Sequence, residues 1–311
     1  MPATLRNLIQ TKKPVADPRP GPTLERIRLA PDTSTARISS KYKTHEPYDK
    51  TDHTPLTDSN MGVFFTCYTE VEAVDFSIDK LYQIYPEIKV LLVSDGGSDY
   101  SHLSKKYPLL RATRDYDSRG FVPYIKKENF LEPAMQEQIV SSALEFLRRI
   151  SLAMDYCDRQ YLLIMEPDAL VRGKLSMPKN AHVTGSLVNE LPFPDLQKVL
   201  LSYPRGIEVP RYGATPTILK RDTFREVYQF VLDHPDVIGK LSRACHTFAN
   251  YDILIPVVFA LLGYQETFDP QIIECLRDPA WETSGRPLVH QFRICYPKPG
   301  SGYTGTHANG K

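Results

Sequence analysis

The chain has 311 residues, 41% of them hydrophobic and 10% aromatic, which is enough apolar material for a substantial core. Its 38 basic and 37 acidic residues nearly balance, so no global field attracts nucleic acid or an anionic membrane surface. The composition therefore indicates a globular protein of one large domain or two small ones. It excludes nucleic acid as an expected partner.

The cysteines and the apolar runs bear on the compartment. The five cysteines are odd in number and far apart, with neither C-x-x-C spacing nor the density of a disulfide scaffold. The longest apolar run, residues 253–263, is too short to span a bilayer, and residues 1–10 lack a signal-peptide core. We therefore expect a soluble, cytoplasmic protein with no transmembrane segment.

The two ends of the chain differ in composition from its middle. Residues 1–60 are rich in Pro, Thr, Ser, Asp, Lys and Arg and lack periodic apolar positions, which predicts a disordered N-terminal arm. Residues 297–311 contain four glycines and two prolines, so a flexible tail is expected there. The folded domain is predicted over residues 61–296.

Apolar strands alternate with amphipathic helices in this domain. An order of strand, helix, strand predicts an α/β fold with a mostly parallel sheet and crossover helices on its faces. In chain order we expect a strand at 62–68, a helix at 74–85, strands at 88–93 and near 109–113, and a helix at 133–156. Strands at 161–165 and 182–188, a loop that leads into a strand over 211–219, and helices at 223–232 and 253–262 follow.

The most informative stretch begins with the apolar run 161–165 and continues as Glu166-Pro167-Asp168. Residues two apart on an extended chain point the same way, and Pro167 favours extended geometry at Glu166. Two converging carboxylates suit Mg²⁺ or Mn²⁺, which take their other ligands from water and phosphates. The alternative is a surface strand that ends in acidic residues.

Two other predicted strands also end in polar residues. The first runs into residues 66–70, and the second into Ser94-Asp95-Gly96-Gly97-Ser98-Asp99. In parallel sheets, ligands bind beyond the carboxyl ends of the strands. We therefore expect Asp95, Glu166 and Asp168 on one rim of the sheet.

Together these stretches resemble the nucleotide-sugar-dependent glycosyltransferases of the GT-A fold over roughly residues 61–290. Glu166-Pro167-Asp168 stands where that family keeps its Asp-x-Asp metal motif, with Glu in place of the first Asp. The turn that contains Asp95 is similar to the turn whose carboxylate contacts the base or ribose. The resemblance implies a GT-A-like, Rossmann-like domain with Mn²⁺ or Mg²⁺ as cofactor.

The resemblance also implies roles for particular residues. Asp168 and Glu166 would hold the metal, and His290 lies where many members place a third ligand, although a lone histidine is more often structural. Asp252 would be the catalytic base of an inverting enzyme, or alternatively a cap of the helix that follows. Arg119, with Lys126 or Lys127, would neutralise phosphate or be a solvated charge. The implied nucleotide-sugar contacts are Thr66, Tyr68, Glu70, Asp95, Arg119 and Pro167.

The expected activity is transfer of a sugar from a UDP- or GDP-linked donor to a hydroxyl of a glycan, protein or lipid-linked acceptor, with inversion. Two alternatives stay open. A nucleotidyltransferase on a related α/β fold usually carries a glycine-rich basic loop after its first strand, where this chain has residues 66–70. A non-catalytic nucleotide-sugar-binding protein with the same fold would differ only in lacking activity.

Overall fold

A computed structural model describes residues 49–67, 70–95, 97–115, 133–187, 198, 212–235, 237, 241, 251–264, 266–267, 273–275 and 285–290. All of these residues belong to one compact unit, Lys43–Lys311. The C-terminal end of the predicted domain, residues 291–296, and the predicted tail, residues 297–311, lie outside the described residues.

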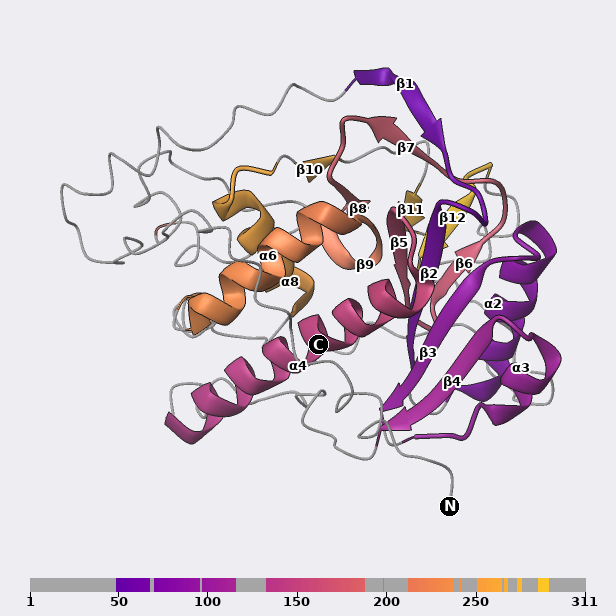
Figure 1. The fold of residues 1–311 in the computed structure, drawn as a ribbon, viewed down its shortest axis with the longest axis horizontal. Coiled ribbons are helices and arrows are strands. Elements are labelled where there is room, and N and C mark those ends of the chain that lie inside the picture. The colour runs from indigo at the N-terminus through magenta and orange to yellow at the C-terminus, as the bar shows by residue number, and fades with distance from the viewer. Residues whose placement is uncertain are drawn as a thin grey trace, which may run out of the picture. The chain divides into compact units, whose positions relative to one another are not determined.

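A seven-stranded sheet forms the centre of the described structure, with the strand order β10-β8-β9-β5-β2-β3-β4 (Figure 1). The four strands from β5 to β4 are parallel to one another, whereas β9 runs antiparallel to both of its neighbours. The strands are β2 (Met61–Cys67), β3 (Lys89–Asp95), β4 (Leu110–Asp115), β5 (Tyr161–Met165), β8 (Val183–Leu187), β9 (Tyr212–Lys220) and β10 (Glu266–Thr267).

The apolar sequences of β2 and β5 explain their central position. Every residue of both strands is buried, which requires cover on both faces of the sheet. β2 lies between β5 and β3, and Phe65 stands opposite Met165 on one side and Leu92 on the other. The predicted α/β architecture with a mostly parallel sheet is confirmed.

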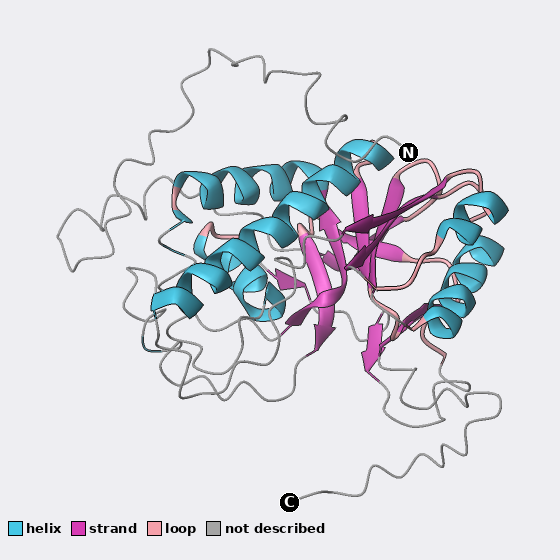
Figure 2. Ribbon diagram, turned by 90° about the horizontal axis from the view of Figure 1, so that it is seen from below, coloured by secondary structure: helices cyan, strands magenta, loops and turns pink. Residues whose placement is uncertain are grey.

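Helices cover both faces of this sheet (Figure 2). α2 and α3 lie on one side, and α4, α6 and α8 on the other. None of the helices in the described part is both long and apolar enough to cross a bilayer. The helices are α2 (Val71–Ile84), α3 (Ser101–Lys106), α4 (Pro133–Cys157), α6 (Arg221–Asp233) and α8 (Tyr251–Leu261).

The end of α8 shows why its predicted stop was correct. Gly263 has a φ of 82°, a left-handed conformation that glycine adopts without steric cost. Its N–H donates to the carbonyl of Ala260, and the N–H of Tyr264 donates to that of Phe259. These two bonds form a Schellman motif, with the rings of Phe259 and Tyr264 in contact across it.

Two smaller sheets contain strands that the sequence pattern did not predict. One has the order β11 (Ile273–Cys275), β12 (Leu288–His290) and β6 (Ala169–Val171). β12 pairs antiparallel with β6, so that His290 stands opposite Ala169. The small sheet therefore brings the end of β12 beside the acidic residues that follow β5.

The other small sheet shortens the expected N-terminal arm. β1 (Asp49–Pro55) pairs antiparallel with β7 (Ser176–Lys179), and the buried Leu56 donates its N–H to the carbonyl of Leu175 at 2.9 Å. Residues 49–60 thus belong to the folded unit, because β1 finds a partner strand far along the chain. Residues 1–48 lie outside the described residues, and their disorder stays a prediction.

Close packing between β2 and α4 gives a first testable prediction. A Cβ placed on Gly62 would lie 2.6 Å from Cys157 Sγ and closer still to its Cβ. We expect Gly62→Ala to lower the free energy of unfolding by about 1–3 kcal/mol, since helix and strand must separate. Gly285→Ala, whose added Cβ would have nothing within 4 Å, is the matched control. Chemical denaturation of both variants measures this, and equal stabilities would contradict the predicted overpacking.

Candidate functional site

The carboxyl ends of β2, β3 and β5 meet at one edge of the sheet. Phe65 pairs with Met165 of β5, and Cys67 pairs with Ser94 of β3, so that the residues after each strand end lie on this edge. The chain moves outward from β2 to β3 and β4 and then returns to β5 on the other side of β2. This reversal is a topological switch point, where α/β proteins bind ligands.

The turn Glu166-Pro167-Asp168 connects β5 to β6. The N–H of Ala169 donates to the carbonyl of Glu166 at 2.9 Å, which closes the turn. The buried hydroxyl of Ser77, from α2, donates to the carbonyl of Ala169 at 2.7 Å. The backbone around Asp168 is therefore held from two sides.

Asp168 and His290 come together at this turn. The distance from Asp168 Oδ1 to His290 Nε2 is 3.6 Å, and the two side chains are only 13% and 16% exposed, respectively. Within the described residues, no group of three or more His, Cys, Asp and Glu side chains is placed to hold a metal ion. A carboxylate still fits Mn²⁺ or Mg²⁺, since such ions can take one or two protein ligands and fill the rest with water and phosphate, and an imidazole beside it favours Mn²⁺ over the harder Mg²⁺.

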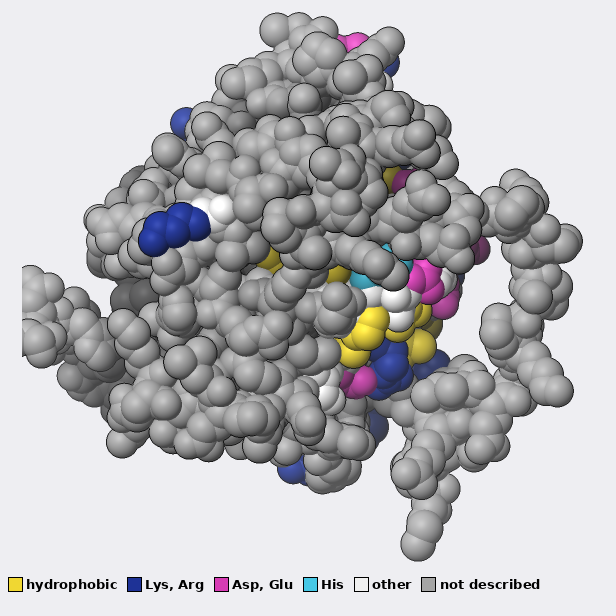
Figure 3. All heavy atoms as spheres, turned by 90° about the vertical axis from the view of Figure 1, so that its left-hand side faces the viewer, with side chains coloured by type: hydrophobic (Ala, Val, Ile, Leu, Met, Phe, Trp, Pro, Cys, Tyr) yellow, Lys and Arg dark blue, Asp and Glu magenta, His cyan; other side chains and the backbone are white. Residues whose placement is uncertain are grey.

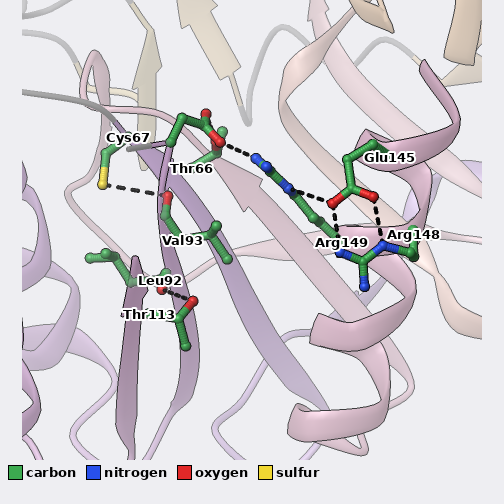
Figure 4. Close-up of polar contacts among 9 residues, drawn as sticks. Thr66, Cys67, Leu92, Val93, Thr113, Glu145, Arg148 and Arg149 are labelled. Atoms are coloured by element: carbon green, nitrogen blue, oxygen red, sulfur yellow. Dashed lines mark hydrogen bonds and ion pairs between the residues drawn. The ribbon is translucent and has the colours of Figure 1, made fainter. Parts of the chain in front are cut away.

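The carboxylate of Asp95 forms the centre of a second polar cluster at the edge. Its other members are Thr66 and three side chains of α4, Glu145, Arg148 and Arg149, which Figure 4 labels. Asp95 Oδ1 pairs with Nη1 of Arg149, and Asp95 Oδ2 accepts from Thr66 Oγ1 at 3.3 Å. The Nε of Arg149 also donates to Glu145 at 3.2 Å, and Arg148 donates to the same carboxylate through two nitrogens at 2.6 Å. Thr66 and Asp95, both predicted to contact the nucleotide sugar, are therefore in contact with each other.

The sequence did not identify Arg149 as a site residue, because a charged residue in a helix usually faces solvent. The sequence carried a signal nevertheless. Arg149 lies three residues after Phe146 and four before Ala153, on the apolar face of α4, and all three are buried. A charged residue on such a face needs a partner of opposite charge, and Asp95 supplies it.

The thiol of Cys67 is next to this cluster. Burial raises the pKa of Cys67 well above its usual range, and the charges of Asp95 and Glu70 raise it further, against the lowering effect of a hydrogen bond with Tyr100. A thiol in such surroundings stays protonated and does not act as a nucleophile.

The remaining predicted residues are placed less completely. Glu70 directly precedes α2 and accepts the N–H of Val74 on its carbonyl, with no side-chain cap. Asp252 is the second residue of α8. Tyr68, Arg119, Lys126 and Lys127 lie outside the described residues.

One face of the molecule gathers side chains of complementary chemistry (Figure 3). A histidine lies beside acidic side chains, and apolar side chains separate them from basic side chains with an acidic neighbour. Carboxylates with a histidine can hold a cation, and basic side chains pair with anions such as phosphate. These features define an α/β protein with a polar site at the switch point of its sheet.

Comparison with known proteins adds distant structural likenesses. No protein-family model matches the chain, and no curated protein matches it. It is similar to core-mannan synthase A of Aspergillus fumigatus in a Mn/GDP form, with 9% identity, a TM-score of 0.48, and 73% of this chain and 80% of that chain covered. An active-site mutant of LgtC gives 11%, 0.40, 76% and 88% for the same quantities.

A third solved structure is a mannosyltransferase of Pyrobaculum calidifontis in complex with GDP-Man and Mn²⁺. It is 15% identical, with a TM-score of 0.39, and the match covers 88% of this chain and 66% of that one. One fold hosts many activities, so likenesses of this degree do not define a function. The function has to be argued from the residues of the site.

Proposed function

We propose that this protein is a metal-dependent glycosyltransferase that moves a sugar from a UDP- or GDP-linked donor to a hydroxyl acceptor, with inversion. The observation that carries the proposal is the pair of Asp168 and His290, brought within 3.6 Å at the switch point of the sheet. A nucleotide bound at such a point places its phosphates near the strand ends. A cation held there meets those phosphates.

The metal would be held by Asp168 and His290, with Glu166 close by in the sequence. When bound, Mn²⁺ or Mg²⁺ stabilises the negative charge that develops on the departing diphosphate. The protein residues orient the donor. Burial of Asp168 and His290 keeps their geometry fixed, because few rotamers are open to packed side chains.

The nucleoside would lie at the other polar cluster. Asp95 is the acceptor proposed for the base or ribose, and Thr66 fixes one of its oxygens. In an inverting transfer, a carboxylate takes the proton of the acceptor hydroxyl as that hydroxyl attacks opposite the leaving diphosphate. Asp252, at the start of α8, is the residue proposed for this role.

Donor binding is predicted to require a divalent cation. Without it, the carboxylates of Glu166 and Asp168 would repel a diphosphate, and a cation held at the acidic turn would offset that repulsion. Calorimetric titration of UDP and GDP, with Mn²⁺, with Mg²⁺ and with chelator, is the measurement. We expect binding with metal and none with chelator. Metal-independent binding of equal strength would remove the role given to the acidic turn.

Product analysis distinguishes the proposed activity from its alternatives. Incubation with UDP- and GDP-linked sugars should release nucleoside diphosphate. The release should be slow when water accepts the sugar and faster when a suitable acceptor is present. A nucleotidyltransferase would instead release pyrophosphate from a nucleoside triphosphate. A binding protein would release neither.

A further inference from the structure

We propose that Arg149 is a positioning residue for the nucleoside part of the donor and acts through the carboxylate of Asp95. The inference rests on the proposed function, in which Asp95 contacts the base or ribose. It adds a residue from α4, which is remote in sequence from the strand ends that form the site.

The exposed fractions show why Arg149 would act indirectly. The side chain of Arg149 is 3% exposed, whereas that of Asp95 is 10% exposed. A ligand at the edge of the sheet can therefore reach the carboxylate but not the guanidinium behind it. Figure 4 shows the guanidinium extending from α4 toward the strand ends.

Both oxygens of Asp95 have a fixed partner on the protein. Arg149 pairs with Oδ1, and Thr66 donates to Oδ2 at 3.3 Å. These contacts tie α4, β2 and β3 together at the switch point. They fix the plane of the carboxylate, and an ionised carboxylate can accept about four hydrogen bonds in all, so this arrangement is compatible with a ligand hydroxyl.

The guanidinium is suited to this role because it reaches two carboxylates at once. Its Nη1 pairs with Asp95 while its Nε donates to Glu145 at 3.2 Å. Burial raises the pKa of Glu145, but the hydrogen bonds and charges of Arg148 and Arg149 outweigh this and leave it lowered. Glu145 thus stays ionised and holds Arg149 in place. An ammonium group offers no such rigid fork.

Stability alone does not account for this cluster. A buried ion pair often stabilises a fold no more than apolar side chains of similar volume would. The neighbouring buried positions of α4, Phe146, Ile150 and Ala153, are apolar. An ion pair among them, at the end of the sheet where ligands bind, is consistent with a functional orientation of Asp95.

The decisive test compares two probes, a nucleoside diphosphate and inorganic pyrophosphate, each with saturating Mn²⁺. We expect Arg149→Gln to weaken binding of the nucleoside diphosphate about 10- to 100-fold. This is the effect expected when a misplaced Asp95 carboxylate loses one charge-assisted hydrogen bond to the nucleoside. Binding of pyrophosphate should stay within about twofold of wild type, because the metal site is separate. A general structural defect would weaken both, and that result would overturn the proposal.

A double-mutant cycle tests whether Arg149 acts through Asp95. The variant with both Arg149→Gln and Asp95→Asn should bind the nucleoside diphosphate no more weakly than Asp95→Asn alone. Arg225→Gln is the matched control, since Arg225 is 55% exposed and pairs with Asp155 rather than with a member of this cluster. It should bind both probes as wild type does. Additive losses in the cycle would overturn the proposal.

A conservative substitution keeps the proposal testable if Arg149→Gln folds poorly. Arg149→Lys keeps the charge and should lose affinity for the nucleoside diphosphate only, by less than Arg149→Gln does. Wild-type affinity in a folded Arg149→Gln or Arg149→Lys variant would overturn the positioning role alone. A wild-type protein that binds no nucleotide would instead overturn the proposed function.

Discussion

Replacing Asp168 by asparagine is expected to weaken Mn²⁺-dependent binding of a nucleoside diphosphate by about 100-fold, equivalent to about 2.7 kcal/mol. The amide keeps the size of the side chain and removes the negative charge that a hard divalent cation requires. His290, an imidazole 3.6 Å away, does not replace that charge. Titration calorimetry at saturating Mn²⁺ gives the affinity.

The control for this experiment is an aspartate outside the site. Asp155 on α4 is 63% exposed and pairs with Arg225 at 3.5 Å. Asp155→Asn changes the net charge by the same amount and should bind as wild type does. If Asp168→Asn also bound the nucleotide with wild-type affinity and wild-type metal dependence, the metal site would have to lie elsewhere.

His290 gives a graded companion to this prediction. His290→Gln removes an imidazole ligand but keeps Asp168 charged, so we expect a smaller loss, about 10-fold in affinity for the metal–nucleotide complex. A loss confined to stability, with normal nucleotide affinity, would assign the histidine a structural role.

The central sheet could be predicted from the sequence because its strands are apolar throughout. Two of these strands, Tyr161–Met165 and Met61–Cys67, are buried on both faces. An unbroken apolar run of this kind predicts a strand even when the partner strand is unknown. Long helices such as α4 could be predicted because their apolar residues recur with the helical period over many turns. The rim that contains Asp95 and the acidic turn followed from strand direction alone.

Short elements with distant partners could not be predicted. β6 and β12 have three residues each, too few to show a period, and they pair across more than a hundred residues of chain. The approach of His290 to Asp168 depends on that pairing. β1 escaped notice because its sequence, Asp49–Pro55, is polar, and α3 because six residues make fewer than two helical turns.

The second large effect is expected at Asp252. If this residue is the base, Asp252→Asn should lower turnover about 10²- to 10⁴-fold, a cost of about 3–5 kcal/mol in transition-state stabilisation. Affinity for the nucleoside diphosphate should stay nearly unchanged, since a base that acts on the acceptor does not hold the donor. The defect thus differs in kind from that of Asp168→Asn, which acts on binding.

The position of Asp252 makes a competing explanation testable in the same variant. As the second residue of α8, an aspartate interacts favourably with the free N–H groups and the dipole of the helix end. If that is its whole role, Asp252→Asn should cost at most about 1 kcal/mol of stability, because asparagine caps nearly as well, and turnover should stay within a few-fold of wild type. Steady-state kinetics and denaturation of one preparation separate the two roles. Wild-type turnover would require another base, or a retaining transfer that needs no base in this place. The anomeric configuration of the product, determined by NMR, then decides between these.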